Sequence, residues 1–135
     1  MFDFRKMRHL INRLPMARYR VDLAKARATR VTASLTGMPH GGGVTSQVES
    51  GVMDIVAARE RYDAIREELA GMVRELRPMI EQLEDPLERN AMRLRYLEGH
   101  RVPAIADALS YSDRRIYQVL EKAEANISLI ANTKA

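Results

Sequence analysis

The chain of 135 residues has no cysteine, no tryptophan and two phenylalanines, and 22 Lys and Arg against 18 Asp and Glu give a net charge of +4. Without cysteine, a disulfide scaffold, a thiolate zinc site and a cysteine nucleophile are excluded. No apolar run approaches the roughly 18 residues of a membrane span. The N-terminus lacks the apolar stretch of a signal peptide, so we expect a cytoplasmic protein. The three histidines (His9, His40 and His100) are scattered, so we expect no metal site, and we expect no cofactor.

The charge is distributed unevenly along the chain. Residues 1–35 carry nine basic and two acidic residues, residues 36–85 five basic and ten acidic, and residues 86–135 eight basic and six acidic. Either the basic N-terminal helices neutralise the acidic segment, or this basic arm (residues 1–30) contacts an acidic partner such as nucleic acid. The first interpretation is favoured because the opposite charges lie in adjacent helical segments. The sequence leaves both open.

A charged fraction of 30% with few aromatic residues favours an all-α fold. Residues 3–14 are predicted to form a short helix that ends near Pro15, and a second helix is predicted from Met16 to residue 35. The apolar positions of the second helix are Tyr19, Leu23, Ala26, Val31 and Leu35. Residues 36–45 are rich in glycine, but no Gly-Lys-Ser/Thr follows, which favours a linker over a phosphate loop.

A long helix is predicted after the linker. Ser46 and Glu49 have the spacing of a capping box, and Pro78 is expected to kink or split the helix near Arg77. Its apolar stripe alternates steps of three and four residues through Ile55, Ala58, Tyr62, Ile65, Leu69, Met72, Leu76, Met79 and Leu83. This stripe packs on the helix at 16–35, forms a dimer interface, or does both. We therefore predict an N-terminal region (residues 1–84) with a long, coiled-coil-like helical hairpin, and a homo-oligomer, with a dimer favoured, through residues 16–83.

Residues 85–135 predict a C-terminal unit of three helices. Asp85 caps the first helix at Pro86, Glu88 completes a capping box, and the helix ends at Gly99. Its apolar face holds Leu87, Ala91, Leu94 and Leu97, with Tyr96 alongside. A helix at about 103–109 turns Val102, Ile105, Ala106 and Leu109 inward, and a helix from Asp113 to about Ile130 buries Ile116, Val119, Leu120, Ala123 and Ile127.

The last two helices are joined by the three-residue turn at 110–112, which is the pattern of a helix-turn-helix. In such a unit the second helix reads DNA. At about 100° per residue, Arg114, Gln118, Glu121 and Lys122 fall opposite Ile116, and Arg115 and Tyr117 flank them. The carboxylates of Asp113 and Glu121 count against DNA binding, since both would lie near a polyanion. Arginine pairs with guanine and glutamine with adenine, while Ser112 and Arg101 suit phosphate contacts. The predicted DNA-binding residues are Arg101, Ser112, Arg114, Arg115, Tyr117, Gln118 and Lys122.

These residues resemble the C-terminal unit of small bacteriophage regulators, the ArpU- and RinA-like proteins, whose helix-turn-helix is similar to region 4 of RNA polymerase sigma factors. The resemblance covers roughly residues 16–130, and the first fifteen residues look like an extension outside it. Val102-Pro103 stands where the family often has a Trp or another large residue, which affects packing rather than chemistry. The residues that carry the resemblance are Ile80-Glu81-Gln82-Leu83, Leu94-Arg95-Tyr96-Leu97-Glu98-Gly99, Ile105-Ala106 and Tyr111-Ser112-Asp113-Arg114-Arg115-Ile116-Tyr117.

The resemblance implies a regulator of phage or prophage late genes that binds double-stranded DNA in the bacterial cytoplasm, associated with the nucleoid. Whether it also contacts RNA polymerase is left open. The alternative is a DNA-packaging protein resembling a small terminase subunit, which also joins a helix-turn-helix to oligomerising helices. We do not expect an enzyme, because no Ser/His/Asp set, metal-ligand spacing or phosphate loop is present.

Overall fold

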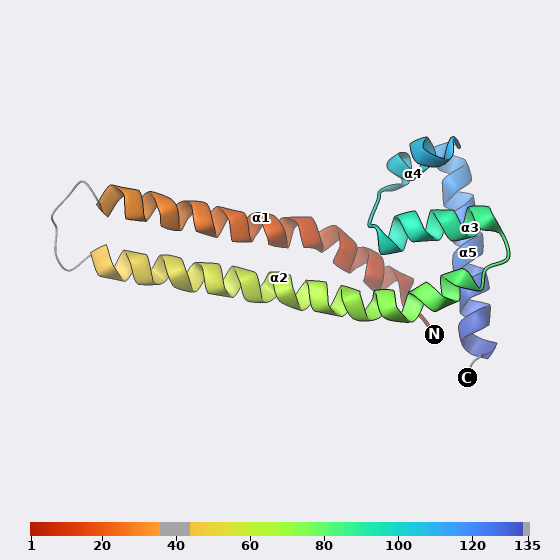
Figure 1. Cartoon of the computed structure of the whole chain (residues 1–135), viewed down its shortest axis with the longest axis horizontal. Coiled ribbons are helices and arrows are strands. Elements are labelled where there is room, and N and C mark those ends of the chain that lie inside the picture. The colour runs from red at the N-terminus through yellow and green to blue at the C-terminus, as the bar shows by residue number, and fades with distance from the viewer. Residues whose placement is uncertain (36–43, 134–135) are drawn as a thin grey trace. The chain divides into compact units, whose positions relative to one another are not determined.

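The computed structural model describes the backbone of residues 1–35 and 44–133 and the side chains of residues 1–30 and 48–133. Every regular element in these ranges is helical, which confirms the all-α fold. The predicted linker at 36–45 lies outside the described residues except for its last two. The helices are α1 (Phe4–Leu35), α2 (Val44–Glu81), α3 (Pro86–Met92), the π-helical turn η1 (Arg93–Leu97), α4 (Val102–Leu109) and α5 (Asp113–Thr133) (Figure 1).

The chain divides into two compact units. One comprises Met1–Ile11 together with Leu69–Ala135, and the other comprises Asn12–Glu68. This division differs from the boundary predicted between residues 84 and 85, because the first turns of α1 and the last turns of α2 share a core with the C-terminal helices.

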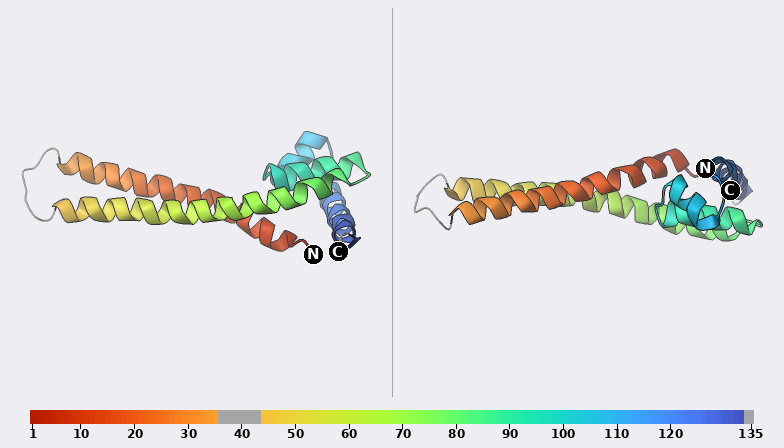
Figure 2. Two further views of the ribbon diagram at one scale, coloured as in Figure 1. Left: turned by 60° about the horizontal axis from the view of Figure 1, so that its bottom comes forward. Right: turned by 90° about the horizontal axis from the view of Figure 1, so that it is seen from above.

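In the unit Asn12–Glu68, α1 and α2 form the predicted antiparallel hairpin, and they run side by side in Figure 1 and in the left view of Figure 2. The predicted stripe of α2 is confirmed, since its members are buried or half-buried. The two helices approach each other closely at Gly51, where an added Cβ would lie 3.5 Å from Ala28 Cβ. The residues of α1 on the inner face repeat in steps of three and four, as in a coiled coil: Leu14, Ala17, Val21, Ala24 and Ala28.

Three predictions for the hairpin are wrong. Pro15 does not end a helix, because α1 continues through it from Phe4 to Leu35. At Pro78, where a kink or a split was predicted, α2 continues without a split. The stripe predicted for α1 is also misplaced, since Tyr19 is 58% exposed and Ala26 is exposed; the side chains of Val31 and Leu35 lie outside the described residues. Tyr19 and Ala26 lie opposite the alanine-rich heptad that meets α2. The predicted cap Ser46 lies inside α2, which begins two residues earlier.

The other unit holds the main hydrophobic core, and the first residues of the chain are part of it. Phe2, Phe4 and Met7 are buried in the same cluster as the apolar faces of α3, α4 and α5. The Phe4 ring lies 5.2 Å from the Tyr96 ring, centroid to centroid. Residues 1–15, which look like an extension in the sequence, therefore supply part of this core.

The start and end of the α3–η1 segment are as predicted, but one residue has a different role. Asp85 caps the helix, its side chain accepting a hydrogen bond from the N–H of Leu87 at 2.9 Å. Glu88 does not complete a capping box. Its carboxylate is buried and accepts from the Asn126 side chain of α5, with N–O distances of 3.2 and 3.3 Å. After η1 the chain reverses at Gly99, whose φ of +74° belongs to the left-handed region that favours glycine.

Candidate nucleic-acid interface

The helix-turn-helix consists of α4, the turn at 110–112 and α5. Both helices pack by the apolar residues predicted for them, and α5 contacts α3 as well as α4. Ile105 and Ala106 of α4 are buried, and so are all five residues predicted for α5: Ile116, Val119, Leu120, Ala123 and Ile127. Because these inner faces are committed to the core, the opposite face of α5 is left for solvent or a ligand.

The turn is fixed by local hydrogen bonds. The N–H of Tyr111 donates to the carbonyl of Ala106 at 2.9 Å, which closes the end of α4. Ser112 caps α5 as predicted, its hydroxyl accepting from the N–H of Arg115 at 3.1 Å. Between them Ser110 has a φ of +61°, in the left-handed region. This conformation is unfavourable for residues with a side chain, although Asn and Asp tolerate it better than the others.

Replacing Ser110 with glycine is expected to stabilise the protein by about 0.5–1 kcal/mol. Glycine removes the left-handed penalty of about 1–2 kcal/mol, and part of this gain is offset by the greater freedom of glycine in the unfolded chain. Chemical denaturation followed by circular dichroism measures the change. The matched control is Gly99→Ala, which places a side chain at φ +74° and should lower the stability. A Ser110→Gly protein that is no more stable than the wild type would contradict this account.

The predicted contact residues lie on the outer face of α5. Arg114, Arg115, Gln118 and Lys122 are all exposed along its N-terminal half, and Tyr117 beside them is 62% exposed. Asp113 in the first turn and Glu121 share this face. Asp113 complements the positive end of the helix dipole. The face therefore offers three cations and one amide, the side chains that pair with guanine, adenine and phosphate.

Arg101 lies apart from this cluster in the sequence, as the residue that precedes α4. It is exposed and its side chain does not cap the helix. Its side chain therefore leaves the N–H groups at the start of α4 uncapped. The Arg101 guanidinium and these N–H groups are both suited to binding a phosphate. The loop before it is held by Arg95, whose guanidinium donates to the carbonyl of His100 at 3.1 Å. This contact, which holds the loop before Arg101, was not predicted from the sequence.

A polar triad joins α1 to α5. Arg8 donates to the Tyr96 hydroxyl at 2.8 Å and also pairs with Glu124 of α5. Tyr96 in turn donates to Glu124. Burial and the hydrogen bond to Glu124 raise the pKa of Tyr96 far above that of an exposed phenol, so Tyr96 stays protonated as the donor. No local sequence pattern predicts this triad, because Arg8 and Tyr96 are 88 residues apart and Tyr96 and Glu124 are 28 residues apart.

Two kinds of site are not found in the described part of the chain. No three His, Asp or Glu side chains there gather closely enough to hold a metal ion. None of the described helices is both long and apolar enough to cross a membrane.

Residues 32–128 match a family described as a protein of unknown function, DUF1492. Because the match covers more than half of the chain, the chain belongs to this family. The matched range contains the whole helix-turn-helix but not residues 2–8, which the structure places in the core. No curated protein and no solved structure matches the chain significantly.

Proposed function

We propose that this protein is a sequence-specific, non-enzymatic regulator of phage or prophage genes that binds double-stranded DNA with α5. One observation carries the proposal. The second helix of a helix-turn-helix has a fully packed inner face, and its opposite face exposes Arg114, Arg115, Gln118 and Lys122. An α-helix fits the major groove, where these side chains can pair with base edges.

In this proposal the parts of the unit have separate tasks. Arg101, Ser112 and the first N–H groups of α4 and α5 bind phosphates and set the position of the helix on the duplex. Arg114, Arg115 and Gln118 read bases, while Lys122 and Tyr117 contact the backbone beside them. The protein acts in the bacterial cytoplasm, associated with the nucleoid, and the resemblance to sigma region 4 makes RNA polymerase a candidate partner.

The proposal is tested by selecting bound duplexes from a random DNA library with the purified full-length protein. We expect one enriched motif. If the protein is a two-fold dimer, the motif contains two half-sites separated by about one helical turn or a multiple of it. Binding without any enriched motif, or turnover of a nucleic-acid substrate, would contradict a sequence-specific, non-enzymatic regulator.

A DNA-packaging protein is the second candidate. The hairpin exposes several large apolar side chains, among them Tyr19, Met53 (71% exposed) and Val56, and such a surface favours self-association. The mass in solution separates the two functions. A ring of eight or more subunits supports packaging, whereas a monomer or dimer supports regulation.

A further inference from the structure

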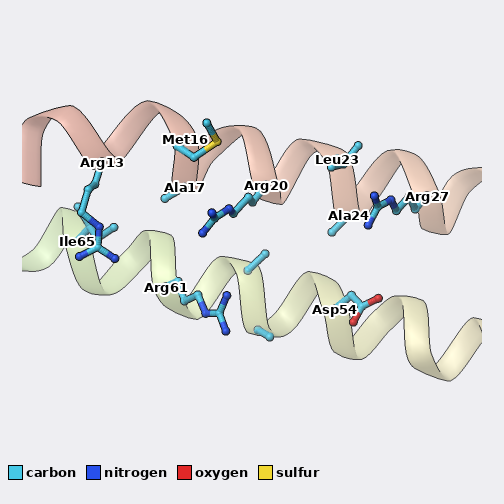
Figure 3. A pocket seen from close by; sticks show the side chains of 12 residues that line it. Arg13, Met16, Ala17, Arg20, Leu23, Ala24, Arg27, Asp54, Arg61 and Ile65 are labelled. Carbon is cyan, nitrogen blue, oxygen red and sulfur yellow. The ribbon is translucent and has the colours of Figure 1, made fainter.

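The hairpin unit Asn12–Glu68 carries a groove between α1 and α2 that the DNA-binding proposal does not use. Arg13, Arg20 and Arg27 of α1 and Arg61 of α2 line it, and we refer to it as the arginine groove. In Figure 3 Arg13 reaches from α1 to α2, Arg20 extends from α1 toward the space between the helices, and Arg61 lies along α2. Asp54 is the one acidic residue of its lining.

The positive charge of the groove is regular and available. The three arginines of α1 are seven residues apart, so they form one row along the helix at intervals of about 10.5 Å. All four arginines are exposed. Among the described residues, none of the four is within ion-pair distance of a carboxylate. The basic N-terminal segment therefore does not neutralise the acidic segment at this surface.

The floor of the groove is apolar. Ala17 and Ala24 of α1 point toward α2 there, whereas Met16 and Leu23 line the groove from the side of α1 that points away from α2 (Figure 3). On α2 the apolar lining is completed by Ala57, Ala58 and Ile65. Met16 is 53% exposed and Leu23 is half-buried, so the hairpin itself leaves apolar surface uncovered here. The floor is flanked by cations that repeat with the heptad of α1.

We propose that the arginine groove binds an acidic amphipathic helix of a partner protein. Such a helix packs as a third helix on the hairpin, with its apolar stripe on the floor and its Glu and Asp residues beside the arginines. The heptad spacing of Arg13, Arg20 and Arg27 matches the spacing at which a helix presents flanking carboxylates. Arginine is well suited to this role because its guanidinium binds carboxylates in a bidentate manner.

Two other occupants fit less well. A nucleic-acid backbone would be attracted by the four arginines, but its phosphates leave the apolar floor without a partner. A second copy of this chain that docks by the same face would place Arg20 and Arg61 against their own symmetry mates, and like charges across an interface are costly.

The opposite side of the hairpin shows that charge alone does not define the site. A second hollow there is lined by Arg18, Lys25, Arg59 and Arg66, with Asp22 and Asp63 among them. Its apolar lining is limited to Val21 and Tyr62. It therefore lacks the apolar floor that a third helix needs, and its arginines provide matched controls.

The test is direct binding of a synthetic helical peptide to the full-length protein, measured by fluorescence anisotropy. The peptide has four heptads with Leu and Ala on its apolar stripe and Glu on both flanks, and its twin carries Lys in place of Glu. We expect the acidic peptide to bind and the basic twin not to bind. The double variant R20E/R61E should weaken binding by about tenfold or more, while R18E/R66E, which changes the same charge on the same two helices, should leave it within about twofold.

Circular dichroism checks that both double variants are folded. The proposal is overturned if the acidic peptide does not bind or if the two double variants weaken it equally. It is also overturned in favour of nucleic acid if R20E/R61E impairs binding to a random duplex but not to the peptide. Loss of self-association in R20E/R61E, measured by sedimentation and without loss of peptide binding, assigns the groove to a second copy instead.

Discussion

Replacing Met7 with alanine is expected to lower the free energy of unfolding by roughly 2–5 kcal/mol. Met7 is completely buried, in one cluster with Phe4 and Tyr96. The truncation removes apolar contacts and leaves a cavity, because the surrounding cluster is built from several helices that cannot all move inward. Urea denaturation of the purified protein measures the loss. Hydrogen exchange should locate it in the unit formed by residues 1–11 and 69–135.

The matched control is Met16→Ala. Met16 belongs to the same helix but is 53% exposed, so its truncation should change the stability by no more than about 0.5 kcal/mol. Equal effects of the two substitutions would contradict the packing of the first turns of α1 into the C-terminal core. Deleting residues 1–8 removes Phe2, Phe4 and Met7 together, a loss comparable to the whole stability of a small domain, which is about 5–15 kcal/mol.

The helix-turn-helix was predictable because its determinants are local. In α4 and α5 the apolar residues recur at helical spacing, Ser112 stands where a cap is needed, and the apolar residues of α5 lie on one face. The same holds for the stripe of α2, which alternates over four heptads without ambiguity. In each case a pattern within about 30 residues decides both the helix and its buried face.

The remaining differences arise where distant contacts override a local rule. Pro15 is a helix breaker by itself, but the residues on both sides of it are held by two packed units, which outweighs the lost hydrogen bond. In α1 both the stripe through Tyr19 and the stripe through Ala17 have helical spacing, and only the position of α2 selects the second. The contact of Phe4 with Tyr96 joins residues 92 positions apart, which no window of sequence reveals.

The same limit applies to the candidate interface. The exposed face of α5 followed from its own periodicity, whereas the Arg8–Tyr96–Glu124 triad depends on the fold. The triad ties the flank of α5 to α1. If α5 reads DNA as proposed, the first turns of α1 influence binding through the position of α5.

Replacing Arg114 with alanine is expected to weaken binding to the selected DNA motif by about 1–3 kcal/mol, or roughly 5- to 150-fold. The expectation rests on the proposed function. Arg114 is exposed in the first turn of α5, opposite the buried Ile116, where a reading helix meets the edges of the bases. Its guanidinium can hold a guanine by two hydrogen bonds, so its loss should also relax the preference at one base pair.

The measurement compares Kd for the selected motif, for the motif altered at each base pair, and for an unrelated duplex, all at one salt concentration. The matched control is Arg93→Ala, which removes an exposed arginine from η1 and should leave the base preference unchanged. A loss that is equal on all three kinds of duplex would reassign Arg114 to a phosphate contact. Unchanged affinity for the motif would show that Arg114 is not part of the interface. If Arg115→Ala and Gln118→Ala also left the affinity unchanged, α5 would not be the helix that reads DNA.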